Sequence, residues 1–235
     1  MFEHSTNYRH LTGDSLALSI KYNIRLKNID YIQIHPTTLY TKKDGREFLI
    51  SESVRGEGAI LLNSKGERFV NELLPRDVVS KAIINEMKKE GSEHVWLSLV
   101  PIPEKEIKTH FPNIYRRCLD EGYDITKEPI PVVPSQHYFM GGIDVDSFSK
   151  TSMNRLYAVG ETACNGVHGK NRLASNSLLE SLVFAKRAAS DINLNYCSAK
   201  ISEEPQVHPE RYKNYQEEYK KLILNSIEKE KQSHE

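Results

Sequence analysis

The sequence has few cysteines and no excess of charge of either sign, and both absences exclude classes of protein. Its 235 residues include three cysteines, Cys118, Cys164 and Cys197, which lie far apart and form no Cys-x-x-Cys pair. Neither a disulfide framework nor a zinc site is therefore predicted. The chain has 32 lysines and arginines and 32 aspartates and glutamates, so its formal net charge is zero. The net charge therefore does not favour nucleic acid or a membrane surface as a partner.

Long apolar segments are also missing. No apolar run reaches the length that spans a membrane, and the N-terminus lacks the apolar region of a signal peptide. Hydrophobic residues make up 38% of the chain, which is enough for one large domain or two small ones. The sequence therefore predicts a reduced, cytoplasmic, globular protein.

The motif that most often marks a dinucleotide site is absent. No Gly-x-Gly-x-x-Gly follows a predicted strand, so the loop that normally binds a pyrophosphate is missing from this chain. A nucleotide cofactor would need other residues to hold it.

Hydrophobic periodicity predicts a mixed α/β protein. Helices are expected at residues 12–20, from Pro75 to Gly91, in two short stretches within 103–121, after residue 175, and at 209–231. Strands are expected at residues 29–34, 48–51, 59–63, 95–100 and 156–163, and the prolines at 129, 131 and 134 predict an extended segment.

The most informative segment runs from Gly166 to Glu180 and reads Gly-Val-His-Gly-Lys-Asn-Arg-Leu-Ala-Ser-Asn-Ser-Leu-Leu-Glu. Its glycines allow the backbone to approach a ligand closely. The helix that follows begins with unpaired N–H groups, which suit an anionic or electron-rich ligand. A plain turn followed by a core helix is the alternative.

Two polar residues lie where predicted elements begin or end. His35, in Ile-His-Pro-Thr-Thr, follows an apolar strand, and a neutral imidazole there can donate to a carboxylate; an ordinary surface histidine is the alternative. Arg76 occupies the first turn of a predicted helix, where a cation is disfavoured unless an anion is close. An ion pair with Asp77 or Glu72 would also explain it.

Three further segments carry polar residues, in two of them beside glycines. They are Ser51–Gly58, read as Ser-Glu-Ser-Val-Arg-Gly-Glu-Gly, Leu74–Val78, read as Leu-Pro-Arg-Asp-Val, and Ser135–Gly142, read as Ser-Gln-His-Tyr-Phe-Met-Gly-Gly. A charged hairpin loop is the alternative for the first. Two arginines and two histidines suit a ligand with two carboxylates. A metal site from His35, His137 and His168 is the rival, although their spacing matches no metal motif.

These motifs resemble those of the succinate dehydrogenase/fumarate reductase flavoprotein family. The resemblance is strongest to its oxidase branch, whose members oxidise L-aspartate, because Ala174-Ser175 and Pro75-Arg76 match that branch. Lys170 departs from the family, which usually has alanine there; such a cation would either alter the flavin potential or point into solvent.

The resemblance implies a site and a cofactor. FAD is the implied cofactor, and L-aspartate or fumarate is the implied small-molecule ligand. It assigns Arg76 as catalytic and gives substrate contacts to His35, Ser51, Glu52, His137 and Arg172. It gives cofactor contacts to Asp14, Glu161, Asn176, Ser177 and Leu178. The implied product, iminoaspartate, would feed NAD biosynthesis through quinolinate synthase, a candidate partner.

The resemblance also implies a division of the chain. Residues 1–45 and 138–197 are expected to form part of an FAD-binding domain, residues 46–137 a capping domain, and residues 198–235 the start of a helical domain. The match covers the middle and later portion of the family's proteins, so a fragment that binds FAD weakly is expected. A fumarate reductase or succinate dehydrogenase fragment, or a truncated chain without catalysis, are the alternatives.

Overall fold

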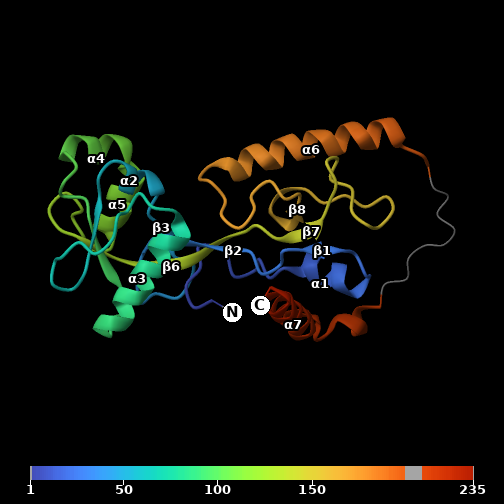
Figure 1. Ribbon diagram of the computed structural model, residues 1–235, viewed down its shortest axis with the longest axis horizontal. Helices are drawn as coiled ribbons and strands as arrows, with labels where there is room; N and C mark the ends of the chain where they lie inside the picture. Colours follow the sequence, from blue (N-terminus) through green and yellow to red (C-terminus); the bar gives the residue numbers. More distant parts are fainter. Residues whose placement is uncertain (1, 199–207, 235) are drawn as a thin grey trace. The chain divides into compact units, whose positions relative to one another are not determined.

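The computed structural model describes residues 2–198 and 208–234, and the chain forms two compact units. The first unit contains the chain up to Arg9 and Gln33–His137, and the second contains His10–Ile32 and the chain from Tyr138 onward. Figure 1 shows the helices and strands of both units.

The first unit is built on a five-stranded sheet with the order β3-β2-β6-β5-β4. Its strands are β2 (Ile32–Leu39), β3 (Phe48–Leu49), β4 (Ile60–Leu62), β5 (Val95–Ser98) and β6 (Ile130–Phe139). Its helices are α2 (Glu52–Gly56), α3 (Arg76–Glu90), α4 (Glu104–His110) and α5 (Pro112–Asp120). The pairs β2–β3, β4–β5 and β5–β6 are antiparallel.

Apolar side chains from the strands and helices of the first unit meet in one core. Leu39, Ile50, Leu61, Ile83 and Leu97 are fully buried in it. Helix α3 ends at Glu90, and the left-handed φ of 63° at the following Gly91 brings the Ser92 N–H to the Met87 carbonyl at 3.0 Å. Glycine adopts this conformation without a steric penalty, so the predicted helix stop is confirmed.

The second unit has a three-stranded sheet with the order β1-β7-β8, in which β1–β7 is antiparallel and β7–β8 parallel. Its strands are β1 (Leu26–Lys27), β7 (Gly142–Asp144) and β8 (Ala163–Cys164). Its helices are α1 (Asp14–Lys21), the 3-10 turns η1 (Gly160–Thr162) and η2 (Pro209–Tyr212), α6 (Asn176–Asn195) and α7 (Tyr215–Ser233). Helix α7 lies beside α1 (Figure 1).

Two glycines let strands of the second unit approach closely. The register that pairs Lys27 with Gly142 places Asn28 opposite Gly141. A Cβ on Gly141 would overlap the Asn28 carbonyl and lie 2.9 Å from the Ile29 Cα. A Cβ on Gly142 would overlap the Thr162 carbonyl, and its φ of 143° also favours glycine.

The mixed α/β class is confirmed, and the predicted helices at 12–20, 75–91 and within 103–121 are present with small shifts at their ends. The predicted strand at 156–163 is wrong: only Ala163–Cys164 is a strand, and Gly160–Thr162 is a 3-10 turn. The prediction took Leu156 and Val159 as signs of a buried strand, but both side chains are exposed.

Other element boundaries also differ from the sequence prediction. The strand predicted at 29–34 begins at Ile32 and continues through Pro36 to Leu39, because this part of the chain is almost wholly buried. The helix predicted at 209–231 starts as a 3-10 turn and is α-helical only from Tyr215 to Ser233.

The domain assignment stays a prediction, although the chain divides into units at Arg9, Ile32 and His137. Part of the segment predicted to begin a helical domain, residues 199–207, lies outside the described residues. No helix within 2–198 or 208–234 is long and apolar enough to cross a membrane.

Candidate functional site

Two histidines meet in the first unit. His35 on β2 is 1% exposed, and its ring centroid lies 5.2 Å from that of His137 on β6. The Thr6 hydroxyl lies 2.8 Å from His137 Nδ1, and His35 Nδ1 lies 3.1 Å from the Thr37 carbonyl oxygen. His35 is therefore a buried residue, and the surface-histidine alternative is wrong.

The surroundings of His35 favour its neutral form. Burial lowers its pKa well below the usual 6.5, and the nearby charges of Arg76, His137 and Arg55 lower it further. Among the described residues, its buried Nε2 has no hydrogen-bond partner. A buried nitrogen of this kind is costly unless a ligand or water satisfies it, so Nε2 is the atom through which His35 would contact a ligand.

His35 is expected to remain uncharged when the pH is lowered through 6.5, the usual histidine value. The unfolded chain then binds a proton that the folded chain does not, so stability should fall as the pH drops below that value. Nitrogen NMR of labelled imidazole rings checks the protonation state, with a free histidine peptide as the reference. A His35 ring that titrates together with that peptide would contradict the buried neutral assignment.

Arg76 is held by two polar side chains. It is 7% exposed at the first turn of α3; its Nε donates to Glu52 Oε2 at 2.6 Å and its Nη1 to Gln33 Oε1 at 2.9 Å. The predicted nearby anion is therefore Glu52. The alternative pairing of Arg76 with Glu72 is wrong, because Glu72 accepts bonds from Arg68 instead.

Ser51 and Glu52 lie at the start of a helix. The Ser51 hydroxyl accepts from the Ser53 N–H at 3.3 Å and caps α2, while Glu52 is the first helical residue and pairs with Arg76. The hairpin-loop alternative for this segment is wrong, since Glu52–Gly56 is helical. A serine N-cap is a common structural role, which competes with a ligand for the hydroxyl.

The sequence prediction missed two buried polar residues of this cluster. Gln33 is 4% exposed and bonds Arg76, and Arg55 is 3% exposed and donates through Nη1 to the Glu72 carbonyl at 2.5 Å. Gln33 stands two residues before His35, so strand alternation places both on one face and was a usable signal. The burial of Arg55 had no such signal, because it depends on where α2 packs.

In the second unit, Arg172 is 5% exposed and its guanidinium lies 4.2 Å from the centre of the Tyr138 ring. Its Nη1 donates to the Leu173 carbonyl at 3.3 Å. Glu161 in η1 accepts from the Phe139 N–H at 2.9 Å, and surrounding protein atoms raise the pKa of its carboxyl, although the residue as a whole is exposed.

Asn176, Ser177 and Leu178 form the first turn of α6, which begins after Ser175 in the left-handed conformation. The core-helix alternative is wrong for this end: Leu178, Leu179 and Leu182 are 74%, 62% and 72% exposed. The N–H groups of a first helical turn have no partner within the helix. Donors beside exposed apolar side chains suit a flat ring with carbonyl oxygens, so this helix end fits a flavin.

Asp14 and Lys170 are also placed within the second unit. Asp14 is exposed at the first turn of α1 and accepts from the Thr12 hydroxyl at 2.7 Å. The Ser15 hydroxyl oxygen lies 2.6 Å from the Thr162 hydroxyl oxygen. The Lys170 ammonium lies 5.1 Å from the centre of the Tyr31 ring, so this cation packs against an aromatic face.

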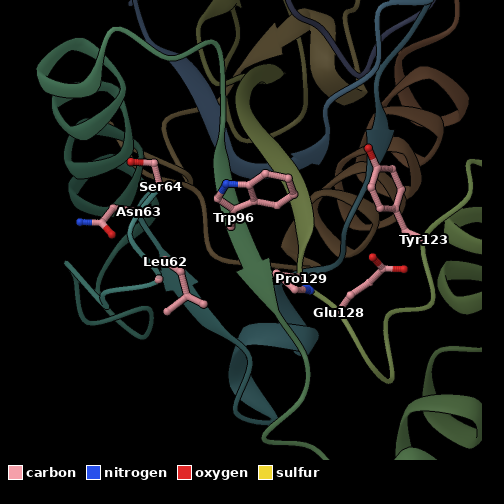
Figure 2. Close-up of a pocket in the computed structure, with 8 residues that line it drawn as sticks. Leu62, Asn63, Ser64, Trp96, Tyr123, Glu128 and Pro129 are labelled. Carbon is pink, nitrogen blue, oxygen red and sulfur yellow. The ribbon is translucent and has the colours of Figure 1, made fainter.

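The described residues offer one group of three potential metal ligands, Asp30, Glu230 and His234, whose ligand atoms lie within 4.8 Å of one another. The three histidines of the rival metal hypothesis are not in this group. A shallow hollow of about 400 Å³ lies elsewhere on the first unit. Figure 2 shows Trp96, Tyr123 and Glu128 among its lining residues, and no predicted site residue borders it.

A family model described as "FAD binding domain" matches residues 1–178. The chain belongs to the FAD binding domain family. The match covers most of the chain and includes His35, Arg76 and Arg172, as well as the first three residues of α6. FAD is thus the cofactor that family membership indicates, in agreement with the donors at the start of α6.

Curated relatives within this FAD-binding family are called L-aspartate oxidase. The chain is 61% identical over 194 residues to the L-aspartate oxidase of Clostridium perfringens, covering 82% of this chain and 44% of the relative. It is 56% identical over 194 residues to that of Clostridium acetobutylicum, covering 82% and 45%. The chain therefore spans less than half the length of these relatives.

Solved structures of flavoproteins share the fold. E. coli quinol fumarate reductase FrdA matches with a TM-score of 0.73 and 30% identity, over 97% of this chain and 40% of that one. Mycobacterium smegmatis Sdh1, solved in complex with UQ1, matches with a TM-score of 0.67 and 35% identity, over 91% and 37%.

Proposed function

We propose that this chain supplies the substrate-binding and part of the flavin-binding residues of an enzyme that oxidises L-aspartate to iminoaspartate. The observation that carries the proposal is the cluster of buried His35 and Arg76 with partly buried His137 and Glu52, in a chain 61% identical to a protein called L-aspartate oxidase. The cluster combines a fixed cation, Arg76, with imidazole nitrogens, which suits an anionic substrate.

L-aspartate carries two carboxylates, and the chain offers matching groups. His35 would donate its Nε2–H to one carboxylate, in the tautomer whose Nδ1 accepts the Thr37 N–H at 3.2 Å. His137, whose Nδ1 lies 2.8 Å from the Thr6 hydroxyl oxygen, would also contact the substrate. Arg172 would bind a carboxylate through two parallel N–H bonds, for which the guanidinium shape is suited. Holding a carboxylate in this way would limit the orientations of the substrate Cα–H.

Arg76 would act at the substrate while staying protonated. Glu52 and Gln33 hold two sides of its guanidinium, which leaves the group fixed and charged. A guanidinium in water keeps its proton above pH 12 or so. Its role is therefore to donate hydrogen bonds and to stabilise negative charge that develops on the substrate.

FAD would supply the two-electron oxidising chemistry when bound: L-aspartate would lose a hydride from Cα to the cofactor and a proton from its amino group, which gives iminoaspartate. The first-turn N–H groups of Asn176, Ser177 and Leu178 would bond the flavin carbonyl oxygens. Asp14 and Glu161 would accept hydrogen bonds from the cofactor. Oxygen or fumarate would be the oxidant that returns the enzyme to its starting state.

The same hypothesis extends to location and partners. The enzyme would be cytoplasmic, and quinolinate synthase would consume its unstable imine product. Fumarate reduction is the second candidate function. The observation that supports this second candidate is the structural match to E. coli quinol fumarate reductase, with a TM-score of 0.73.

The substrate preference separates the two functions. The test uses a chimera, called the oxidase chimera, in which this chain replaces the matching segment of the Clostridium perfringens protein. L-aspartate should bleach the flavin absorbance of this chimera faster than succinate does. The amino nitrogen shares the positive charge that develops as hydride leaves, and succinate has no such atom. Fumarate should still reoxidise the reduced chimera, because it has the same two carboxylates.

Anaerobic stopped-flow absorbance of the flavin measures all three reactions. The unmodified Clostridium perfringens protein is the matched control for cofactor loading. Faster bleaching by succinate than by L-aspartate would assign the chain to the dehydrogenase branch instead.

A further inference from the structure

The Arg172 guanidinium lies over the face of the Tyr138 ring. The cation lies 4.2 Å from the ring centre, and the two residues are 7% and 5% exposed. At this distance and burial, the attraction between a guanidinium and an aromatic face is at its strongest. Tyr138 directly follows His137 in β6, and the strand therefore fixes where its ring lies.

The Tyr138 hydroxyl does not supply a negative charge. Burial raises its pKa to about 12, the carboxylates of Glu161 and Glu180 raise it, and Arg172 lowers it. The ring is thus a neutral phenol at physiological pH, and the contact with Arg172 is with the face of the ring. Phenylalanine would preserve such a contact.

A second set of side chains fixes the ring itself. His168 meets Tyr138 edge-on, with ring centroids 5.6 Å apart and an interplanar angle of 88°. His168 Nε2 lies 4.0 Å from Glu180 Oε2, and the Glu180 carboxylate accepts a hydrogen bond from Asn165. Glu180 is itself 5% exposed and lies on α6, so the ring is held between the glycine turn and the helix.

Stacking and carboxylate binding use different parts of a guanidinium. The stack uses the face of the planar group, whereas its N–H donors point outward in the plane. A ring below Arg172 therefore restricts the tilt of the plane without consuming the donors that recognise a carboxylate.

We propose that Tyr138 is a positioning residue: its ring holds the Arg172 guanidinium in the plane in which it binds a substrate carboxylate. The inference rests on the proposed function for the role of Arg172, and adds to it a residue that contacts neither substrate nor cofactor. Leucine at this position would leave an apolar core residue but no aromatic face.

The test uses the complete chain with labelled arginine, compared among Tyr138→Leu, Tyr138→Phe and the control Tyr157→Leu. Tyr157 belongs to the same unit but donates its hydroxyl to Asp191. The Nε–H resonance of Arg172, assigned by its loss in Arg172→Lys, should be displaced by the Tyr138 ring current. The displacement should vanish in Tyr138→Leu and persist in the other two variants.

Fumarate titration of the oxidase chimera carrying the same substitutions gives the functional readout. The dissociation constant should rise by about tenfold in Tyr138→Leu and stay close to the unaltered value in Tyr138→Phe. An unchanged resonance in Tyr138→Leu, or a lost ring contact with unchanged fumarate affinity, would overturn the positioning role. If the unaltered oxidase chimera bound no fumarate, the proposed function would fail, while the ring-current shift would still decide whether the ring contact exists.

Discussion

Replacing Arg76 by lysine is expected to lower kcat for L-aspartate oxidation in the oxidase chimera by about 10²–10³-fold, the usual effect of removing one fixed donor from a reacting site. Lysine keeps the charge but has one nitrogen, so it cannot bond Glu52 and Gln33 in the geometry that the Nε and Nη1 of Arg76 use. Steady-state rates with L-aspartate, at matched FAD content, measure the loss.

Arg68→Lys is the matched control. Arg68 also pairs with a glutamate of the first unit, Glu72, but more than half of its side chain is exposed. Its replacement should leave kcat nearly unchanged, because an exposed ion pair contributes little. Equal losses in the two variants would show that the effect of Arg76 comes from folding and not from its position beside Glu52.

Gly141→Ala is expected to destabilise the chain by about 3 kcal/mol or more, at the upper end for overpacked sites. The new Cβ would overlap the Asn28 carbonyl and crowd the Ile29 Cα. These are backbone atoms, so no side-chain rotation relieves the overlap. Relief would require β1 and the following turn to move, which disturbs the 2.9 Å bond from the Met140 N–H to the Tyr31 carbonyl.

Thermal unfolding of the 235-residue chain, followed by circular dichroism, measures this effect. A loss of that size should lower Tm by roughly 10 °C in a chain of this length. Gly56→Ala is the control, since no atom lies within 4 Å of its added Cβ and its φ is not positive. Equal Tm values for Gly141→Ala and the unaltered chain would mean that the two strands lie farther apart than described.

Local sequence patterns predicted some residues of the candidate site and missed others. Arg76 was found because a cation at a helix N-terminus needs an anion, and that physical argument was right. The argument could not choose the anion: Asp77 and Glu72 are near in sequence, whereas Glu52 is 24 residues away and bonds Arg76. The position of Gln33 could have been predicted, because strand alternation puts it on the same face as His35. The burial of Arg55 could not, because it depends on tertiary packing alone.

The order of helices, the stop of α3 at Gly91 and the short helices α4 and α5 followed from the sequence, because periodicity, glycine and proline act over a few residues. Residues 156–159 misled the same reasoning, since Leu156 and Val159 are exposed and the segment forms no strand. The neutrality of His35 and the stack of Tyr138 on Arg172 were decided only by tertiary structure. Both depend on the exclusion of water and on contacts between segments distant in the chain, and neither can be predicted from a short segment of the sequence.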